Sequence, residues 1–500
     1  MTNFSGKPLS SKTANVACGG PQGGGMDSRR NTGVAEVSPK YLAEAVSNAV
    51  PVGYKQTEVG VIPADWDAVC LGDVSEVRMC KRILAGQTQK IGAIPFFKIG
   101  TFGGESDAYI PQFLYEDFKA KYSFPDKGDI LISAAGTLGK SVIYDGMPAY
   151  FQDSNIVWLK VNQRKLLNEY LYHYYKVIKW ASSEGSTIAR LYNGIIRASM
   201  IALPATLEQT AIANALSDVD ALISELEKLI AKKQAIKTAT MQQLLTGRTR
   251  LPQFALREDG TPTNSSGTNL DAGTGGPQGE GQDGLRKGTK PSELGGIPED
   301  WEVVELGSVI ERFIGGGTPS RSNGEYWGNQ IPWVTVKDFA IFNPYSAQES
   351  ITKKGLISSA SNLIPKGTLI TSTRMALGKA VIYQVDVAIN QDMKALICGQ
   401  ELSTEFLYFW FEANKNKIDE LGSGSTVKGL SLPDLRKVSF LLPPKEEQTA
   451  IATILSDMDE EIQALEQRLG KTRKIKQGMM QELLTGKTRL IKPSKEVIHE

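Results

Sequence analysis

The sequence predicts an α+β protein in which two globular units are joined by two long helices that pair as an antiparallel coiled coil with pseudo-two-fold symmetry. Three observations support this fold class. Residues 209–247 recur, closely matched and without a gap, at residues 448–486. Each copy follows a more divergent stretch in which short β-branched runs alternate with glycine-rich turns. Within each copy, apolar residues recur at heptad spacing.

Composition limits the class of protein. A chain of 500 residues is too long for one core and fits two domains. The 56 basic and 55 acidic residues leave a net charge of +1, which neither indicates nor excludes a nucleic-acid partner. The four cysteines lack metal-site or redox spacing, so we expect a reduced, cytoplasmic protein without a bound metal. No apolar run approaches the roughly 18 residues of a membrane span.

The repeats divide the chain into successive segments. Each globular unit starts near an Ile-Pro-x-Asp-Trp motif, at residues 62–66 and again at 297–301. Clusters of Gly, Ser, Asn and Asp separate the two halves, which is typical of a flexible linker. We therefore expect a glycine-rich, disordered extension (1–53), a first globular unit (54–206), a first long helix (207–250), a flexible linker (251–290), a second unit (291–445), a second long helix (446–490) and a tail (491–500).

The long helices carry one apolar stripe each, with steps of four and three residues. Acidic residues lie early and lysines late in the helix, in agreement with the helix macrodipole. A single such stripe could pack on its own globular unit, but two equal copies favour pairing with each other. The predicted seam consists of Ile212, Leu216, Val219, Ile223, Leu226, Ile230, Ile451, Leu455, Met458, Ile462, Leu465 and Leu469.

No catalytic constellation is evident. Residues 135–141 resemble a phosphate-binding P-loop, but Ala134 stands where that loop requires glycine. Asn343-Pro344-Tyr345 lacks the second proline of the adenine methyltransferase motif. With only His173 and His499 in the chain, a histidine-based triad has few possible members, and we interpret both histidines as ordinary.

Basic and hydroxyl residues in the glycine-rich loops are the candidates for DNA contact. Phosphates are bound by such donors, and base edges are read by Arg, Lys, Asn or Gln. Each residue taken alone is more often a solvated surface charge, but some occupy matching places in both copies. The candidates are Lys81, Arg82, Lys98, Lys140, Arg190 and Tyr192 in the first unit, and Arg321, Asn323, Lys337, Arg374, Lys379 and Lys428 in the second.

Taken together, the motifs resemble those of the specificity subunit of type I restriction-modification systems. The resemblance spans roughly residues 54–490. It is carried by the two Ile-Pro-x-Asp-Trp motifs, the Glu-Gln-Thr-Ala-Ile helix starts at 208–212 and 447–451, the Leu-Leu-Thr-Gly-Arg/Lys-Thr-Arg-Leu ends at 244–251 and 483–490, and Gly-Thr-Leu-Gly-Lys at 136–140.

The resemblance implies two target recognition domains, each reading one half of a bipartite double-stranded DNA site, with the coiled coil as spacer. Because the units diverge in sequence, the site should be asymmetric. It also implies two modification subunits that carry S-adenosylmethionine and methylate adenine N6, and restriction subunits that use ATP and Mg²⁺, with no cofactor bound by this chain. The alternatives are a fused methyltransferase and a structural scaffold that reads no DNA.

Overall fold

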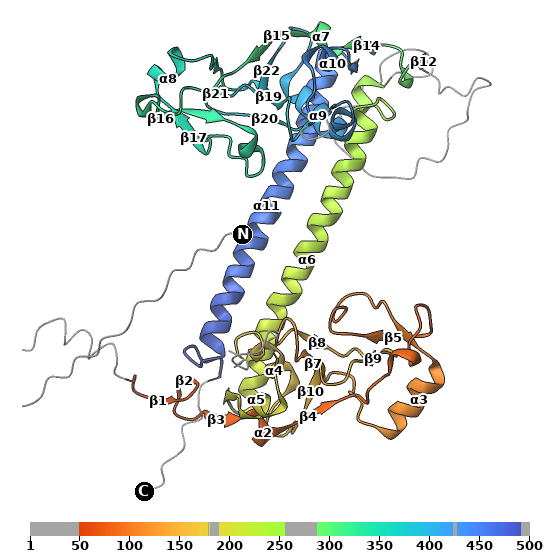
Figure 1. The fold of residues 1–500 in the computed structure, drawn as a ribbon, viewed down its shortest axis with the longest axis vertical. Helices are drawn as coiled ribbons and strands as arrows, with labels where there is room; N and C mark the ends of the chain where they lie inside the picture. The colour runs from red at the N-terminus through yellow and green to blue at the C-terminus, as the bar shows by residue number, and fades with distance from the viewer. Residues whose placement is uncertain (1–49, 179, 181–189, 256–287, 424–427, 492–500) are drawn as a thin grey trace, which may run out of the picture.

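The computed structural model describes residues 50–178, 180, 190–255, 288–423 and 428–491. Figure 1 shows one globular unit at each end of two long helices that run side by side in opposite directions. The predicted fold class is confirmed, with two mixed α/β units and an antiparallel helix pair between them. We call residues 54–203 with the start of the first long helix domain 1, and residues 289–442 with the start of the second domain 2.

The two long helices are α6 (Thr206–Leu244) and α11 (Lys445–Leu483), with 39 residues each. Each follows a proline, Pro204 or Pro444, which has no amide hydrogen to continue a preceding element. Each ends shortly before a glycine with left-handed backbone, Gly247 (φ +67°) or Gly486 (φ +69°). The local sequence therefore determines where both helices begin and end.

Charge order along the helices favours the antiparallel orientation. Lys237, late in α6, lies 2.6 Å from Asp459, early in α11. The equivalent pair, Lys476 late in α11 and Asp220 early in α6, is also in contact. Because each helix is acidic near its start and basic near its end, a parallel pair would place like charges opposite each other. The same segregation that suits the macrodipole thus also selects the partner's direction.

Domain 1 is built around a four-stranded antiparallel sheet of order β4-β10-β7-β8 and a three-stranded sheet of order β6-β5-β9. Its strands are β1 (Tyr54–Thr57), β2 (Gly60–Pro63), β3 (Asp67–Cys70), β4 (Ser75–Met79), β5 (Ile94–Phe97), β6 (Tyr109–Ile110), β7 (Ile130–Ser133), β8 (Ser141–Ile143), β9 (Tyr150–Phe151), β10 (Ile156–Val161) and β11 (Met200–Leu203). Its helices are α2 (Leu71–Val74), η1 (Ala85–Gln87), α3 (Gln112–Lys121), α4 (Asn168–Tyr174) and α5 (Asn193–Ala198).

Domain 2 repeats the first sheet as β15-β22-β19-β20, but its second sheet has four strands, β17-β16-β21-β18. Its strands are β12 (Thr289–Ser292), β13 (Gly295–Pro298), β14 (Glu302–Glu305), β15 (Ile310–Gly315), β16 (Trp327–Val334), β17 (Glu349–Ile351), β18 (Leu363–Ile364), β19 (Leu369–Ser372), β20 (Ala380–Ile382), β21 (Val387–Ile389), β22 (Met393–Cys398) and β23 (Ser439–Leu442). Its helices are α7 (Leu306–Val309), η3 (Gly324–Tyr326), η4 (Val336–Phe339), α8 (Lys353–Ile357), α9 (Thr404–Glu420) and α10 (Leu432–Arg436).

The apolar stripe of each long helix is divided between two environments. Ile212 and Leu216 are buried in the core of domain 1, together with Leu483 from the end of α11. Ile451 and Leu455 are likewise buried in the core of domain 2, with Met241 and Leu244 from the end of α6. The first turns of each helix therefore pack on the domain that precedes them, which is the alternative that we considered for a single apolar stripe.

Helix-to-helix packing occupies the middle of the rod. Leu226, Ile230 and Leu469 form a small separate core there, with Ile223 and Leu465 against it. Of the remaining seam positions, Ile462 is buried, while Val219 and Met458 are half-buried. The helix pair therefore has a short apolar centre and ends that are held by the domains.

The structure describes both edges of the expected linker, residues 251–255 and 288–290. Leu251 is buried and precedes a short 3-10 helix, η2 (Pro252–Phe254), while β12 already begins at Thr289. The remaining linker residues, 256–287, lie outside the described residues, as do residues 1–49 of the amino-terminal extension and 492–500 of the tail. Among the helices that the structure describes, none is both long and apolar enough to cross a membrane.

The contact between α4 and α6 predicts a pH dependence. His173 is fully buried, and its Nε2 lies 3.0 Å from Ser217 Oγ on α6. Burial, assisted by the charge of Lys176, lowers the pKa of His173 from 6.5 to about 4. Between those values the unfolded chain binds a proton that the folded chain excludes, so stability should be full above pH ~6.5 and fall toward pH ~4.

We expect this histidine to reduce the free energy of unfolding by on the order of 2 kcal/mol between pH 7.5 and 5. Urea unfolding at the two pH values measures the loss, and His173→Gln should remove it while retaining a group that can bond to Ser217. An equal pH dependence in both proteins would contradict this assignment.

Candidate nucleic-acid interface and the clamps that hold it

A buried carboxylate joins three distant segments at the domain 1 end of the rod. Glu208, at the start of α6, accepts a hydrogen bond from Trp66 Nε1 at 2.9 Å. Arg489, beyond the end of α11, donates to the same carboxylate, with Nη2 at 2.7 Å from Oε2. The same guanidinium donates from Nη1 and Nη2 to Asp65, at 2.8 Å each. We call Asp65, Trp66, Glu208 and Arg489 the first clamp.

The domain 2 end carries the same arrangement. Trp301 Nε1 donates to Glu447 at 2.9 Å, and Arg250 donates to Glu447 at 2.8 and 2.6 Å. Arg250 also donates to both carboxylate oxygens of Asp300, at 2.8 and 2.9 Å. These four residues form the second clamp. In each clamp the arginine comes from the end of the other half's helix, so the two halves of the chain hold each other.

Glycine turns bring the two arginines into place. A Cβ on Gly486 would lie 2.4 Å from Pro63 Cγ, and a Cβ on Gly247 would lie 2.6 Å from Pro298 Cδ. Both positions also have positive φ, so only glycine fits there without displacement. The Leu-Leu-Thr-Gly repeat is therefore the turn by which each helix end approaches the start motif of the opposite half.

Charge balance within the first clamp is reflected in its titration. Hydrogen bonds from Arg489 lower the pKa of Asp65, and the bonds to Asp65 and Glu208 raise the pKa of the Arg489 guanidinium. Glu208 itself is 3% exposed, so the guanidinium and the indole N–H take the place of water as its hydrogen-bond donors. The ends of the rod are thus fixed by charged groups that are bonded on all sides.

The candidate DNA contacts of domain 1 lie on its surface, several with partners inside the domain. Arg82 pairs with Asp153 at 2.8 Å, and Lys98 pairs with Asp107 at 2.8 Å. Lys81 Nζ lies 5.0 Å from the centre of the Tyr122 ring, and Lys140 Nζ donates to the Phe102 carbonyl. The remaining two candidates are Arg190, which is half-buried, and Tyr192, which is exposed.

In domain 2 the candidates fall into two regions. Arg321 lies over Trp327, with its guanidinium 3.9 Å from the ring centre, and pairs with Glu349. Asn323 caps η3 by accepting from Glu325 N at 3.0 Å, and the exposed Lys337 lies in η4 of the same subregion. The other region is the loop between β19 and β20 with its neighbour, which holds Arg374, Lys379 and Lys428. The structure therefore does not gather all candidates into one patch.

The clamps themselves were missed by reasoning from sequence. Their members stand in three motifs that each occur twice, at the domain start, the helix start and the helix end. The joint recurrence of Trp, Glu and Arg could have indicated that the motifs meet. Arg489 and Glu208 are 281 residues apart in the sequence, so no local pattern indicates that they are in contact.

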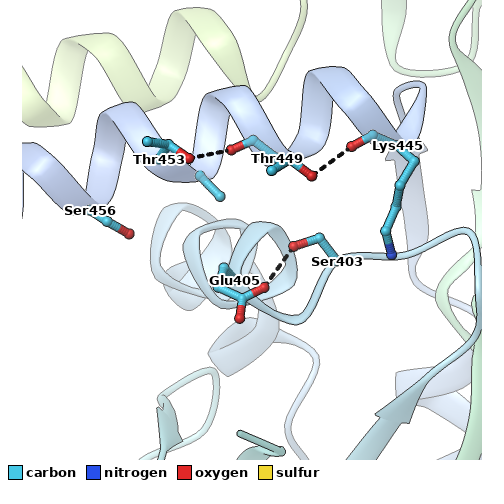
Figure 2. Close-up of a pocket in the computed structure, with 7 residues that line it drawn as sticks. Ser403, Glu405, Lys445, Thr449, Thr453 and Ser456 are labelled. Atoms are coloured by element: carbon cyan, nitrogen blue, oxygen red, sulfur yellow. Dashed lines mark hydrogen bonds between the residues drawn. The ribbon is translucent and has the colours of Figure 1, made fainter.

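A hollow of about 410 Å³ lies where α9 starts against α11 (Figure 2). Its lining is Ser403, Glu405, Lys445, Thr449, Ala452, Thr453 and Ser456. The Thr449 and Thr453 hydroxyls donate to carbonyls of their own helix, and Ser403 Oγ donates to Glu405. The two threonine hydroxyls therefore complete hydrogen bonding within α11, and the Ser403 hydroxyl caps the start of α9, where it also accepts from Phe406 N.

The first clamp predicts a large effect of one substitution. Arg489→Ala should reduce the free energy of unfolding of domain 1 by roughly 3–5 kcal/mol, because the buried Glu208 carboxylate loses its counter-charge. Urea unfolding followed by tryptophan fluorescence measures the change. Arg473→Ala is the matched control on α11, since its pair with Glu227 is exposed and contributes at most about 1 kcal/mol. Equal losses in the two variants would contradict the proposed energetics.

The comparisons with known proteins agree with this architecture. The family model described as "Type I restriction modification DNA specificity domain" matches residues 63–238 and 298–477. A type I restriction enzyme specificity subunit of Haemophilus influenzae is 53% identical over 156 residues, which cover 31% of this chain and 40% of that protein. One from Methanocaldococcus jannaschii is 28% identical over 455 residues, covering 87% of this chain and 97% of that protein.

A solved structure shares the fold. The crystal structure of the type I restriction-modification system S subunit from M. genitalium aligns with a TM-score of 0.51 at 15% identity, covering 84% of this chain and 96% of that one. The family model alone matches more than half of the chain, in both halves. The chain therefore belongs to the type I restriction-modification DNA specificity family and is a DNA-recognition subunit without catalytic function of its own.

Proposed function

We propose that this chain reads an asymmetric, bipartite double-stranded DNA site, with one half-site for each domain and an unread spacer set by α6 and α11. The observation that carries this proposal is the placement of two divergent units at opposite ends of one clamped rod. A helix of 39 residues is about 58 Å long at about 1.5 Å per residue. That length corresponds to roughly 17 base pairs at about 3.4 Å each.

Differences between the domains support unequal half-sites. Domain 1 has a three-stranded second sheet and domain 2 a four-stranded one, so the loops around these sheets cannot present the same side chains. In domain 2, Arg321 stacks on Trp327 and bonds to Glu349, which holds its guanidinium in a defined direction at 56% side-chain exposure. Nη1 and Nη2 both donate to Glu349, at 3.1 and 2.6 Å, so the N–H groups that remain on this fixed guanidinium are the ones that would contact guanine or phosphate.

We further propose that catalysis belongs to partner subunits: two modification subunits with S-adenosylmethionine, which methylate adenine N6, and restriction subunits with ATP and Mg²⁺. The pseudo-two-fold arrangement supports the presence of two modification subunits, because a surface that occurs in both halves can bind the same partner twice. An exposed apolar row on α6 is a candidate surface for one of the two partners, since α11 has Glu461 and Arg468 at the positions equivalent to Leu222 and Leu229. It consists of Leu222, Leu229 and Ile236, spaced by seven residues and each 39–41% exposed.

Mapping of methylated adenines in cells that express the chain with its modification subunits tests the proposed function. We expect one sequence with two different specified halves and a constant gap. Methyl transfer by the purified chain alone would favour a fused methyltransferase instead. A footprint without two protected half-sites would favour the scaffold alternative.

The rod predicts the length of the gap. Removal of seven facing residues from the middle of both α6 and α11 keeps the heptad phase and shortens the rod by about 10 Å. The preferred gap should decrease by about three base pairs, or site-specific methylation should cease. Methylation mapping of the shortened protein measures the gap. An unchanged gap would show that the length of α6 and α11 does not set it.

The apolar row predicts the partner's docking site. A Leu222→Glu and Leu229→Glu double variant should lower the number of modification subunits bound per chain, measured by light scattering of the purified complex. Ile91→Glu, at a more exposed apolar residue of domain 1 (86%), is the control and should leave the mass unchanged. Full assembly of the double variant would exclude this face.

A further inference from the structure

Each domain contains an isolated β-bridge that joins the loop after β7 or β19 to a segment far along the chain. In domain 1 the bridge pairs Ala135 with Arg190, and in domain 2 it pairs Arg374 with Gly429. The gapless alignment of Gly139-Lys140 with Gly378-Lys379 places Ala135 opposite Arg374. The two bridges are therefore equivalent, but the arginine stands on opposite sides of them.

Backbone hydrogen bonds confirm that the surroundings of the bridges are equivalent. Ala134 N donates to Asn155 O at 2.7 Å, and Thr373 N donates to Asp392 O at 2.8 Å. Asn155 and Asp392 each stand one residue before the central strand, β10 or β22. On the other side, Leu191 N donates to Ala134 O at 2.8 Å, and Leu430 N donates to Thr373 O at 2.9 Å.

Both guanidinium groups reach the same neighbour from opposite strands. Arg190 Nη2 lies 2.8 Å from Asn155 Oδ1 in domain 1. Arg374 Nη1 lies 3.8 Å from Asp392 Oδ1 in domain 2. The structure thus retains the place of the guanidinium, while the backbone position that supplies it has changed.

The loop keeps a positive φ at the residue after the bridge even where the sequence disfavours it. Gly136 in domain 1 has φ +68°, and Met375 follows Arg374 in domain 2 with φ +55°. A non-glycine residue adopts this backbone conformation only at a cost in free energy. Met375 is 57% exposed, so little packing offsets that strain. Strain that packing does not explain is typical of loops shaped for a ligand.

We propose that Arg190 and Arg374 are equivalent DNA-contacting arginines, one in each domain, exchanged across the same bridge. This inference rests on the proposed DNA-reading function. A purely structural role explains domain 2 poorly, because 3.8 Å is too long for a hydrogen bond and the Arg374 side chain is 67% exposed. A guanidinium in this state is free to form bidentate bonds to a phosphate or to guanine O6 and N7.

In domain 2 there is space to move the arginine from position 374 to position 429, on the other side of the bridge. Gly429 does not have positive φ, and a Cβ added there would meet its nearest atoms at 3.8 Å (Thr373 O) and 3.9 Å (Arg374 Cγ). Those are ordinary van der Waals contacts. An arginine at position 429 is therefore sterically allowed, and the Arg374→Ala change provides further space.

The test compares full-length variants, assembled with their modification subunits, on a duplex that carries the mapped site and on duplexes with one half-site scrambled. Arg374→Ala should weaken binding to the intact site by on the order of 10- to 100-fold, which is the range of one bidentate contact. Arg374→Ala combined with Gly429→Arg should recover most of this loss. In domain 1, Arg190→Ala should weaken binding and Ala135→Arg should restore it.

Arg312→Ala, at a 65% exposed arginine that pairs with its neighbour Glu311, is the control and should bind as the wild type does. The inference is overturned if Arg374→Ala binds with wild-type affinity, or if neither exchange restores binding while melting temperatures stay at the wild-type value. A loss of melting temperature with unchanged DNA affinity would also overturn it, since that is the structural role. If the wild-type complex prefers no sequence, the proposed function fails before the inference is tested.

Discussion

The structure depends on two buried carboxylates, Glu208 and Glu447, each of which must be neutralised by an arginine from the other half of the chain. A buried carboxylate without a partner is strongly destabilising. Glu208 is 3% and Glu447 1% exposed, and each is bonded to an indole N–H and a guanidinium. Neither domain can therefore complete its junction with its own helix alone. The arginine must arrive at the far end of a second 39-residue helix, which requires the antiparallel pair.

This requirement explains why the apolar seam can be short. The first two seam positions of each helix are buried in a domain core, and the clamps hold the ends. Only the middle of the rod relies on Leu226, Ile230 and Leu469. The charge pairs between Lys237 and Asp459, and between Lys476 and Asp220, add direction rather than much burial. Charged contacts with specific geometry at both ends fix the register of the two helices and therefore the distance between the domains. A long apolar seam alone fixes that distance less well, because it can slip by one heptad.

Periodicity and repetition were sufficient to predict the architecture from sequence, because helix phase, helix boundaries and duplication are local properties of the chain. The clamps were not predictable in the same way. Asp65, Glu208 and Arg489 meet across 281 and 424 residues of sequence, and only the fold brings them together. The candidate DNA contacts show the same limit, since Arg82 and Lys98 have carboxylate partners within their domain. Residue type indicates which side chains could bind phosphate, but not which of them are already engaged.

The two domains differ in a way that clarifies what a recognition domain must retain. Their main sheets correspond strand for strand, yet the arginine beside the central strand comes from Arg190 in one and from Arg374 in the other. Alignment of sequence alone would treat these residues as unrelated, because each faces a small residue in the other copy. A side chain on either strand of one β-bridge can reach the same volume, so selection for a charge at a place in space leaves the backbone position free to change. Divergence between the halves can then alter base preference elsewhere while one contact to DNA stays fixed relative to the rod.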